Sequence, residues 1–247
     1  MNHHQYVFIG GLHRSGTTLL ANCLREHPKI SGFKDTGVNE DEGQFLQSVY
    51  PPAMVYGGPG RFGFNSSSFL NETSDLASSE NAQKMFQEWS QHWDLTQPIL
   101  LEKSPPNLLK TRFLQNLFPN SFFIIILRHP IPVAYATKKW SHTQLYSLIK
   151  HWLVCYEQFE RDQPYLKRLL VLKYEDLIEN PQLILNQIYT FIGVESVISN
   201  VNISVGVNDH YFNWWKDRQN LFKALYTDYI QVKFEKRVNR FGYSLRV

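Results

Sequence analysis

The chain of 247 residues is long enough to bury one sizeable core, and its composition, 43% hydrophobic and 19% charged, is typical of a soluble globular protein. The formal net charge of +3 suits an anionic ligand but falls far short of a concentrated basic face, so we expect no nucleic-acid partner. The most apolar run, Phe122 to Leu127, is too short to cross a bilayer, and no leader pattern precedes the first apolar run. We therefore expect a cytoplasmic protein.

Short, continuous apolar runs alternate with longer amphipathic stretches along the chain. Runs of this length without polar alternation are typical of strands that are buried on both faces of a parallel sheet. We predict strands near Tyr6, Ile99, Phe122 and Leu169, and a shorter one over residues 29–33.

Stretches with helical spacing of apolar residues lie between and after these strands. We predict helices over residues 17–27, 141–167 and 182–193. Cys23 and Cys155 fall within the first two, where a small buried thiol is favoured over a disulfide or a metal ligand. Strands and helices in alternation predict an α/β, three-layer fold with a central parallel sheet flanked by helices, as a single domain over residues 1–247.

Two segments do not follow this alternation. Residues 36–79 are rich in Gly, Pro, Ser and Asn, and a loop of that length inside a compact domain is usually functional or mobile. We expect this insertion to help form a ligand pocket, with Tyr56, Phe62 and Phe64 as partly apolar walls. The aromatic-rich tail, residues 200–247, is predicted to pack as a flank or a lid.

The first predicted strand leads into a glycine-rich turn, "GGLHRSGTT". Gly11 and Gly16 have the spacing of a phosphate-binding P-loop, which aims backbone N–H groups and a helix dipole at one anion. Thr17 stands where a nucleotide triphosphatase has the Lys that reaches the β- and γ-phosphates, so we predict a P-loop-like cradle for a single phosphate. The alternative is a tight strand-to-helix turn without a ligand. The residues predicted to bind the anion are Arg14, Ser15, Gly16, Thr17 and Thr18.

Two further predicted strands end in positively charged residues. Arg128 follows the run "FFIIIL", and Lys103 follows the run at Ile99. Ligands of open α/β sheets bind along the carboxyl edge of the strands, so we expect both cations to face the same crevice as the glycine-rich turn. Alone, each would also fit an ordinary surface salt bridge. Three cationic strand ends at one edge predict an anion site.

With these motifs in place, the sequence resembles the sulfotransferases that use 3′-phosphoadenosine 5′-phosphosulfate (PAPS), in the bacterial branch that is similar to Golgi carbohydrate and tyrosyl-protein enzymes. "GLHRSGTTLL" resembles the 5′-phosphosulfate loop, with Arg14 where cytosolic relatives carry Lys, and "LRHPIPVAYAT" resembles the 3′-phosphate motif that opens with Arg128. "EKSPPN", "LKYEDLIENP" and "FGYSL" are similar to later segments, so the likeness covers nearly the whole chain. Two positions depart from the pattern: Ala136, followed by Thr137, replaces a Ser, and Leu19 replaces a Trp.

The resemblance implies transfer of a sulfuryl group from PAPS to a hydroxyl by in-line displacement. Arg14 and Lys103 are then catalytic cations that stabilise charge on the leaving phosphate, and the scheme requires no metal. Arg128 and Thr137 are the residues expected to hold the 3′-phosphate. Because Leu19 replaces the usual Trp, another ring must stack on adenine.

The general base must come from another segment, because a His follows the Lys-Thr pair in cytosolic relatives whereas this chain continues from Lys103 into Ser104. In the Golgi-like branch the base is a Glu after the second strand, where this chain reads "NEDEGQFLQ". We favour Glu42, because Gly43 behind it allows close backbone approach. The alternatives are Glu40, Asp41, His13, His129 and His142.

Two other functions fit parts of the pattern. A P-loop phosphotransferase that uses ATP and Mg²⁺ would need a Lys after Gly16 and an acidic strand end for the metal. A nucleotide-binding module without catalysis would bind 3′,5′-adenosine bisphosphate and transfer nothing. For the sulfotransferase, the acceptor is predicted to be a hydroxyl-bearing small molecule, saccharide or lipid, and the sequence does not choose among them.

Overall fold

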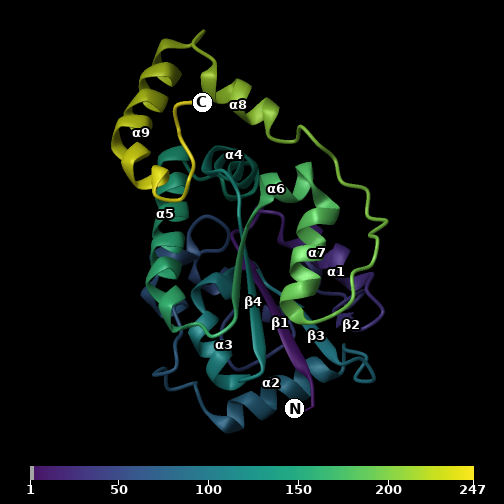
Figure 1. The fold of residues 1–247 in the computed structure, drawn as a ribbon. Helices are drawn as coiled ribbons and strands as arrows, with labels where there is room; N and C mark the ends of the chain where they lie inside the picture. Colours follow the sequence, from purple (N-terminus) through teal and green to yellow (C-terminus); the bar gives the residue numbers. More distant parts are fainter. Residues whose placement is uncertain (1–2) are drawn as a thin grey trace.

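The computed structural model describes residues 3–247, and in these residues a five-stranded parallel sheet has helices on both faces (Figure 1). The strands are β1 (Gln5–Gly11), β2 (Ile30–Gly32), β3 (Ile99–Lys103), β4 (Ser121–Leu127) and β5 (Leu169–Lys173). They lie in the order β2-β3-β1-β4-β5, and each neighbouring pair is parallel. The predicted α/β fold and the predicted strands are confirmed.

The central strands show why continuous apolar runs form this sheet. All seven residues of β4 are buried, because β1 and β5 flank the strand and helices cover both faces. In β1, Tyr6 and Phe8 pack against one helical layer. Val7 and Ile9 pack against the other. Burial on both faces therefore leaves no polar alternation in the sequence.

The helices form two outer layers. One face of the sheet packs against α1 (Thr17–Arg25), α6 (Tyr174–Glu179) and α7 (Pro181–Ile192). The other packs against α2 (Ser79–Ser90), α3 (Thr111–Leu117), α4 (Pro130–Ser141) and α5 (Leu145–Asp162). The tail forms α8 (Asp209–Lys216) and α9 (Leu221–Asn239), which lie at the opposite end of the molecule from α2 (Figure 1).

Helix boundaries differ from the prediction at two places: α1 ends at Arg25 rather than at residue 27, and the second helix is shorter at both ends. The predicted helix over 141–167 starts at Leu145, because α4 runs through Ser141 and His142 ends it with a left-handed φ of 49°. α5 stops at Asp162, where a 3₁₀ turn containing Pro164 follows. The prediction for the third helix is confirmed, with Gly193 as its left-handed cap. Both cysteines are buried and free, as predicted.

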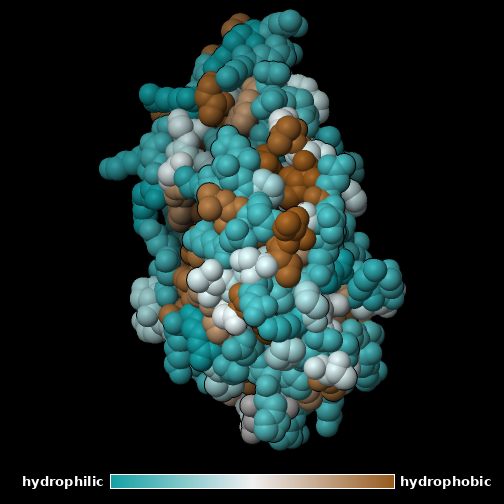
Figure 2. Space-filling view, turned by 45° about the vertical axis from the view of Figure 1, so that its right-hand side comes forward, coloured by the Kyte–Doolittle hydropathy of each residue, from teal (hydrophilic) through white to brown (hydrophobic). Residues whose placement is uncertain are grey.

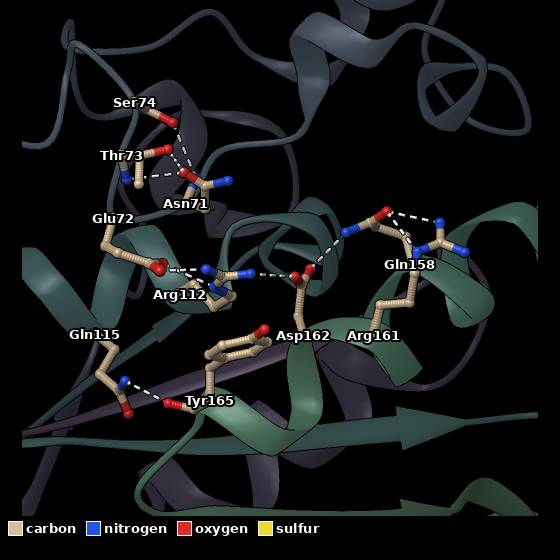
Figure 3. Close-up of polar contacts among 10 residues, drawn as sticks. All are labelled: Asn71, Glu72, Thr73, Ser74, Arg112, Gln115, Gln158, Arg161, Asp162 and Tyr165. Carbon is tan, nitrogen blue, oxygen red and sulfur yellow. Dashed lines mark hydrogen bonds and ion pairs between the residues drawn. The ribbon is translucent and has the colours of Figure 1, made fainter.

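The segment over residues 36–79 contains five short 3₁₀ turns, and an ion pair near its end links it to α3. Arg112 of α3 donates to Glu72 of this segment (Nε to Oε2, 2.7 Å) and lies 3.4 Å from the Asp162 carboxylate of α5 (Figure 3). The Tyr165 ring lies 3.9 Å from the Arg112 guanidinium carbon. The end of the 36–79 segment is therefore held against α3.

The helices of the tail pack against the layer of α4 and α5. Trp215 of α8 and Phe234 of α9 are buried in the same core cluster as residues of α4 and α5. Figure 2, in which the α7 side comes forward, shows separate hydrophobic patches on an otherwise hydrophilic face. Within residues 3–247, none of the helices combines the length and the apolar character needed to span a bilayer.

Candidate active site

A cavity of about 310 Å³ opens at the carboxyl edge of the sheet. Its walls come from the turn after β1, from residues 39–42, and from the ends of β3, β4 and β5, with α4 along one side. This is the edge at which open α/β sheets bind ligands. The sequence-predicted site residues that line it are Arg14, Gly16, Thr17, Thr18, Glu42, Arg128 and Thr137. The alternative bases His13 and Glu40 line it as well.

The glycine-rich turn has the geometry of an anion cradle. Gly16 has a φ of 97° and directly precedes the first residue of α1, whose first-turn N–H groups have no intrahelical acceptor. A Cβ on Gly16 would lie 2.4 Å from Cδ2 of Tyr174, so only Gly fits here. Arg14 is exposed, with its guanidinium 5.5 Å from the Trp140 ring centroid. Ser15 is fully buried and stands outside the cavity lining.

Arg128 is held in place on three sides. Its Nη1 donates to the Arg14 carbonyl (2.8 Å), and Nε and Nη2 donate to the side-chain oxygen of Asn208 (3.0 and 2.6 Å). The Tyr174 ring centroid lies 4.2 Å from its guanidinium carbon. The guanidinium therefore faces the cavity in a fixed orientation.

Glu175 supports this arrangement from the next layer. Its Oε1 accepts hydrogen bonds from the Asn208 amide and from the backbone N–H of His129, each at 3.0 Å. Its Oε2 accepts from the hydroxyl of Tyr243 (2.8 Å). The His129 ring contacts the Ser244 carbonyl at 2.9 Å, and burial lowers its pKa to about 4. His129 is thus engaged in holding the C-terminal residues.

Glu42 and Lys103 lie close together in a buried pair. The Lys103 ammonium is 3.6 Å from Oε1 of Glu42 and donates to the Glu40 carbonyl at 2.6 Å. Burial raises the pKa of Glu42 and lowers the pKa of Lys103. Glu42 lines the main cavity, whereas Lys103 lines a neighbouring cavity of about 180 Å³, with Thr18 and Glu40 between the two. Lys103 is therefore the one predicted catalytic residue that the described structure holds beside the cavity rather than in its lining.

The other candidate bases have different surroundings. The Asp41 carboxylate accepts hydrogen bonds from the backbone and hydroxyl of Thr36 (2.9 and 2.7 Å) and lies 3.6 Å from Arg25. His13 lines the cavity, but burial and two nearby cations lower its pKa to about 3, too low for a base at neutral pH. His142 ends α4. Glu42 has the raised pKa and the position that general-base work needs.

Three residues to which the sequence analysis gave no role also line the cavity or hold Arg128. Tyr174 directly follows β5, just as Arg128 directly follows β4. Its position after the run "LLVLK" was the signal in the sequence that could have placed it at the same edge of the sheet. Trp140, 70% exposed at the end of α4, lines the cavity and offers a ring face. Asn208 precedes α8 and lies 80 residues beyond Arg128, and no local pattern marks it.

Comparison with known proteins identifies the family. The model of the sulfotransferase family matches residues 6–197, from β1 to beyond α7. The chain belongs to the sulfotransferase family. The resemblance seen in its motifs is thereby confirmed at the level of the family.

This sulfotransferase is also similar to individual known proteins. It is 30% identical over 128 residues to a putative protein-tyrosine sulfotransferase of Caenorhabditis briggsae; the match covers 51% of this chain and 40% of that relative. Its fold is similar to the sulfotransferase domain from the curacin biosynthetic pathway (TM-score 0.58, 15% identity, 98% of each chain). It is also similar to the sulfotransferase domain of the Synechococcus PCC 7002 olefin synthase (TM-score 0.59, 16% identity, 97% and 94% of the two chains).

Proposed function

We propose that this sulfotransferase moves the sulfuryl group of PAPS to the hydroxyl of an acceptor by in-line displacement, with Glu42 as general base. One observation carries the proposal: a single cavity has an anion loop and Arg128 among its walls and a buried carboxylate, Glu42, in the same lining. Positively charged groups stabilise the negative charge of the donor, and a carboxylate with a raised pKa can accept the proton of the acceptor hydroxyl.

Two anion sites in one cavity fit a donor with two separate anionic groups. The turn at Gly16 suits the 5′-phosphosulfate, since the start of α1 and Arg14 both favour negative charge there. Arg128 suits the 3′-phosphate, because three of its five N–H groups are used internally and two are left for a ligand. Thr137 lines the wall beside it, next to Ala136. The rings of Trp140 and Tyr174 offer faces for the purine.

The transfer exchanges one oxygen–sulfur bond for another. The acceptor oxygen forms a bond to sulfur while the bond from sulfur to the 5′-phosphate oxygen breaks, and Glu42 takes the acceptor proton. The electron pair of the broken bond stays on the leaving bisphosphate, where Arg14 and the first N–H groups of α1 stabilise it. Lys103 joins these cations once its ammonium leaves the Glu40 carbonyl, which accepts it at 2.6 Å.

The 36–79 segment contributes to the wall of the cavity on the side that we propose for the acceptor. Pro59 of the 36–79 segment lines the cavity, which supports our proposal that this segment belongs to the acceptor side. We propose a small molecule, a saccharide or a lipid with a hydroxyl group. A protein tyrosine is a fourth class of acceptor to test, because it appears in the name of the nematode relative. The single-domain and cytoplasmic assignments stay predictions.

The decisive experiment is calorimetric titration with 3′,5′-adenosine bisphosphate and, separately, with ATP and Mg²⁺. Arg128→Ala should weaken bisphosphate binding about 10–100-fold, the effect of losing a charged hydrogen-bonding partner. Arg161→Ala is the matched control, because this exposed Arg contacts Gln158 on α5. Preference for ATP, or equal binding by the two variants, would overturn the PAPS assignment. Bisphosphate binding without turnover of any acceptor would point to a binding module.

A further inference from the structure

Glu102 of β3 carries a carboxylate that the proposed transfer does not use. Its side chain is fully buried at the end of the strand. The backbone N–H of Gly43 (3.0 Å) and the hydroxyl of Ser104 (2.6 Å) donate to Oε1, and the amide of Asn107 donates to Oε2. Three donors around one carboxyl group match the ionised form, because a protonated acid would need an acceptor for its own hydrogen.

One oxygen of this carboxylate holds the segment that bears Glu42. Gly43 directly follows Glu42, and the Ser104 hydroxyl that donates to Glu102 also accepts the backbone N–H of Gln44 (2.9 Å). The Gln44 side-chain amide in turn donates to Glu42 Oε2, and its oxygen accepts from the backbone N–H of a neighbouring turn. The peptides that follow Glu42 are thus fixed to the end of β3.

This close approach also explains the glycine behind Glu42. A Cβ on Gly43 would lie 2.5 Å from Oε1 of Glu102, although Gly43 has no left-handed backbone that would itself demand glycine. The Glu102 carboxylate can therefore reach the Gly43 N–H only because residue 43 has no side chain.

The second oxygen reaches the strand that carries the anion loop. Asn107 donates through Nδ2 both to Glu102 and to the carbonyl of Ile9 (3.0 Å), which lies in β1 just before the glycine-rich turn. One carboxylate therefore joins the base-bearing segment to the strand below the donor loop. The charged and titratable groups that act on Glu102 or respond to it are Lys103, Glu42, Tyr50 and Lys110.

We propose that Glu102 is a positioning residue, which sets the place of Glu42 relative to the anion loop and so aligns the acceptor oxygen with the donor. The inference rests on the proposed role of Glu42 as base. Burial raises the pKa of Glu102 to about 7, so about half of the molecules carry the ionised group at neutral pH, and its ionisation weakens the folded state. A group that lowers stability in its working form is better explained by alignment than by support of the fold.

The test compares Glu102→Gln with Glu235→Gln. Glu102→Gln keeps one acceptor, the side-chain carbonyl oxygen. Its NH₂ group takes the place of the other carboxylate oxygen and would face a hydrogen-bond donor instead of accepting from it. Glu235 is the matched control, because its carboxylate also accepts from a Ser hydroxyl, an Asn amide and a backbone N–H, on α9 and outside the cavity lining. The readouts are hydrogen exchange of peptides covering residues 39–47, binding of 3′,5′-adenosine bisphosphate, and the unfolding midpoint in urea.

We expect Glu102→Gln to raise exchange over residues 39–47 by about tenfold or more while bisphosphate affinity changes less than about threefold and global stability does not fall. Glu235→Gln should leave that peptide unchanged, and Glu102→Asp should restore part of the protection. With an acceptor identified, Glu102→Gln should lower kcat while the KM for PAPS and the acidic limb of the rate profile stay in place, because Glu102 is not among the groups that shift the pKa of Glu42. A merely structural role would not give a loss that is confined to kcat and partly restored in Glu102→Asp.

Unchanged exchange over residues 39–47 in Glu102→Gln would overturn the proposal, as would a loss of bisphosphate affinity as large as in Arg128→Ala. If Glu102→Gln does not fold, Ser104→Ala tests the same link by removing the shared hydroxyl, and protection must fall there too. The exchange result does not depend on catalysis. Full activity in Glu42→Gln would remove the proposed base, yet it would leave the measured link between Glu102 and the segment in place.

Discussion

Replacing Gly16 with Ala tests the anion loop most directly. Its φ of 97° lies in the left-handed region, which costs a residue with a Cβ about 1–2 kcal/mol. The new methyl group would also lie 2.4 Å from the Tyr174 ring, and overpacking of this kind costs about 1–3 kcal/mol. The ring cannot move freely, since Arg128 packs on it at 4.2 Å. We expect a total loss of about 2–5 kcal/mol, the sum of the two effects.

Gly193→Ala separates the two contributions. Gly193 caps α7 with a φ of 78°, and a Cβ there meets no atom within 4 Å. This variant should therefore lose only the conformational part, about 1–2 kcal/mol. Urea unfolding gives both losses, and calorimetry should show that Gly16→Ala alone loses 3′,5′-adenosine bisphosphate. Equal destabilisation of the two variants, with bisphosphate binding intact in both, would refute our description of the loop.

Three further predictions concern the chemistry. Glu42→Gln should reduce transfer about 10²–10⁴-fold with bisphosphate binding intact. Burial raises the Glu42 pKa above 4.5, so the wild-type rate should rise with pH through a limb that this variant lacks; a retained limb would assign the base elsewhere. Lys103→Met should lower the rate about 10²-fold if its ammonium reaches the transferring group, and an unchanged rate would leave it as a partner of the Glu40 carbonyl. His13→Gln should keep the acidic limb, because a pKa of about 3 leaves His13 neutral at working pH; a shifted limb would contradict this.

The sheet and the glycine-rich turn could be predicted because their signals are local. β4 is buried along its whole length, so its sequence is a continuous apolar run, and a reader of the sequence alone can recognise it. The turn at Gly16 combines a fixed glycine spacing with the start of a helix, and both are visible in nine residues. The family followed from the same motifs.

The remaining features depend on contacts between distant segments. Asn208 reaches Arg128 across 80 residues, and nothing near it in the sequence marks it as a partner of Arg128. Lys103 is a strand-end cation as predicted, but the Glu40 carbonyl holds it beside the cavity because residues 40 and 41 both adopt left-handed backbone. The break between α4 and α5 depends on the left-handed His142, which helical periodicity does not reveal.

The contacts around Glu175 have a practical consequence for anyone who prepares fragments of this protein. The family match ends at residue 197, so a fragment trimmed to the recognised region would keep Gly16 and Arg128. It would lose Asn208 and Tyr243, whose hydrogen bonds orient Arg128 and anchor Glu175. If the proposed function is right, we expect such a fragment to keep both signature motifs and still bind the bisphosphate poorly, so the boundary of sequence similarity would not be the boundary of the working unit.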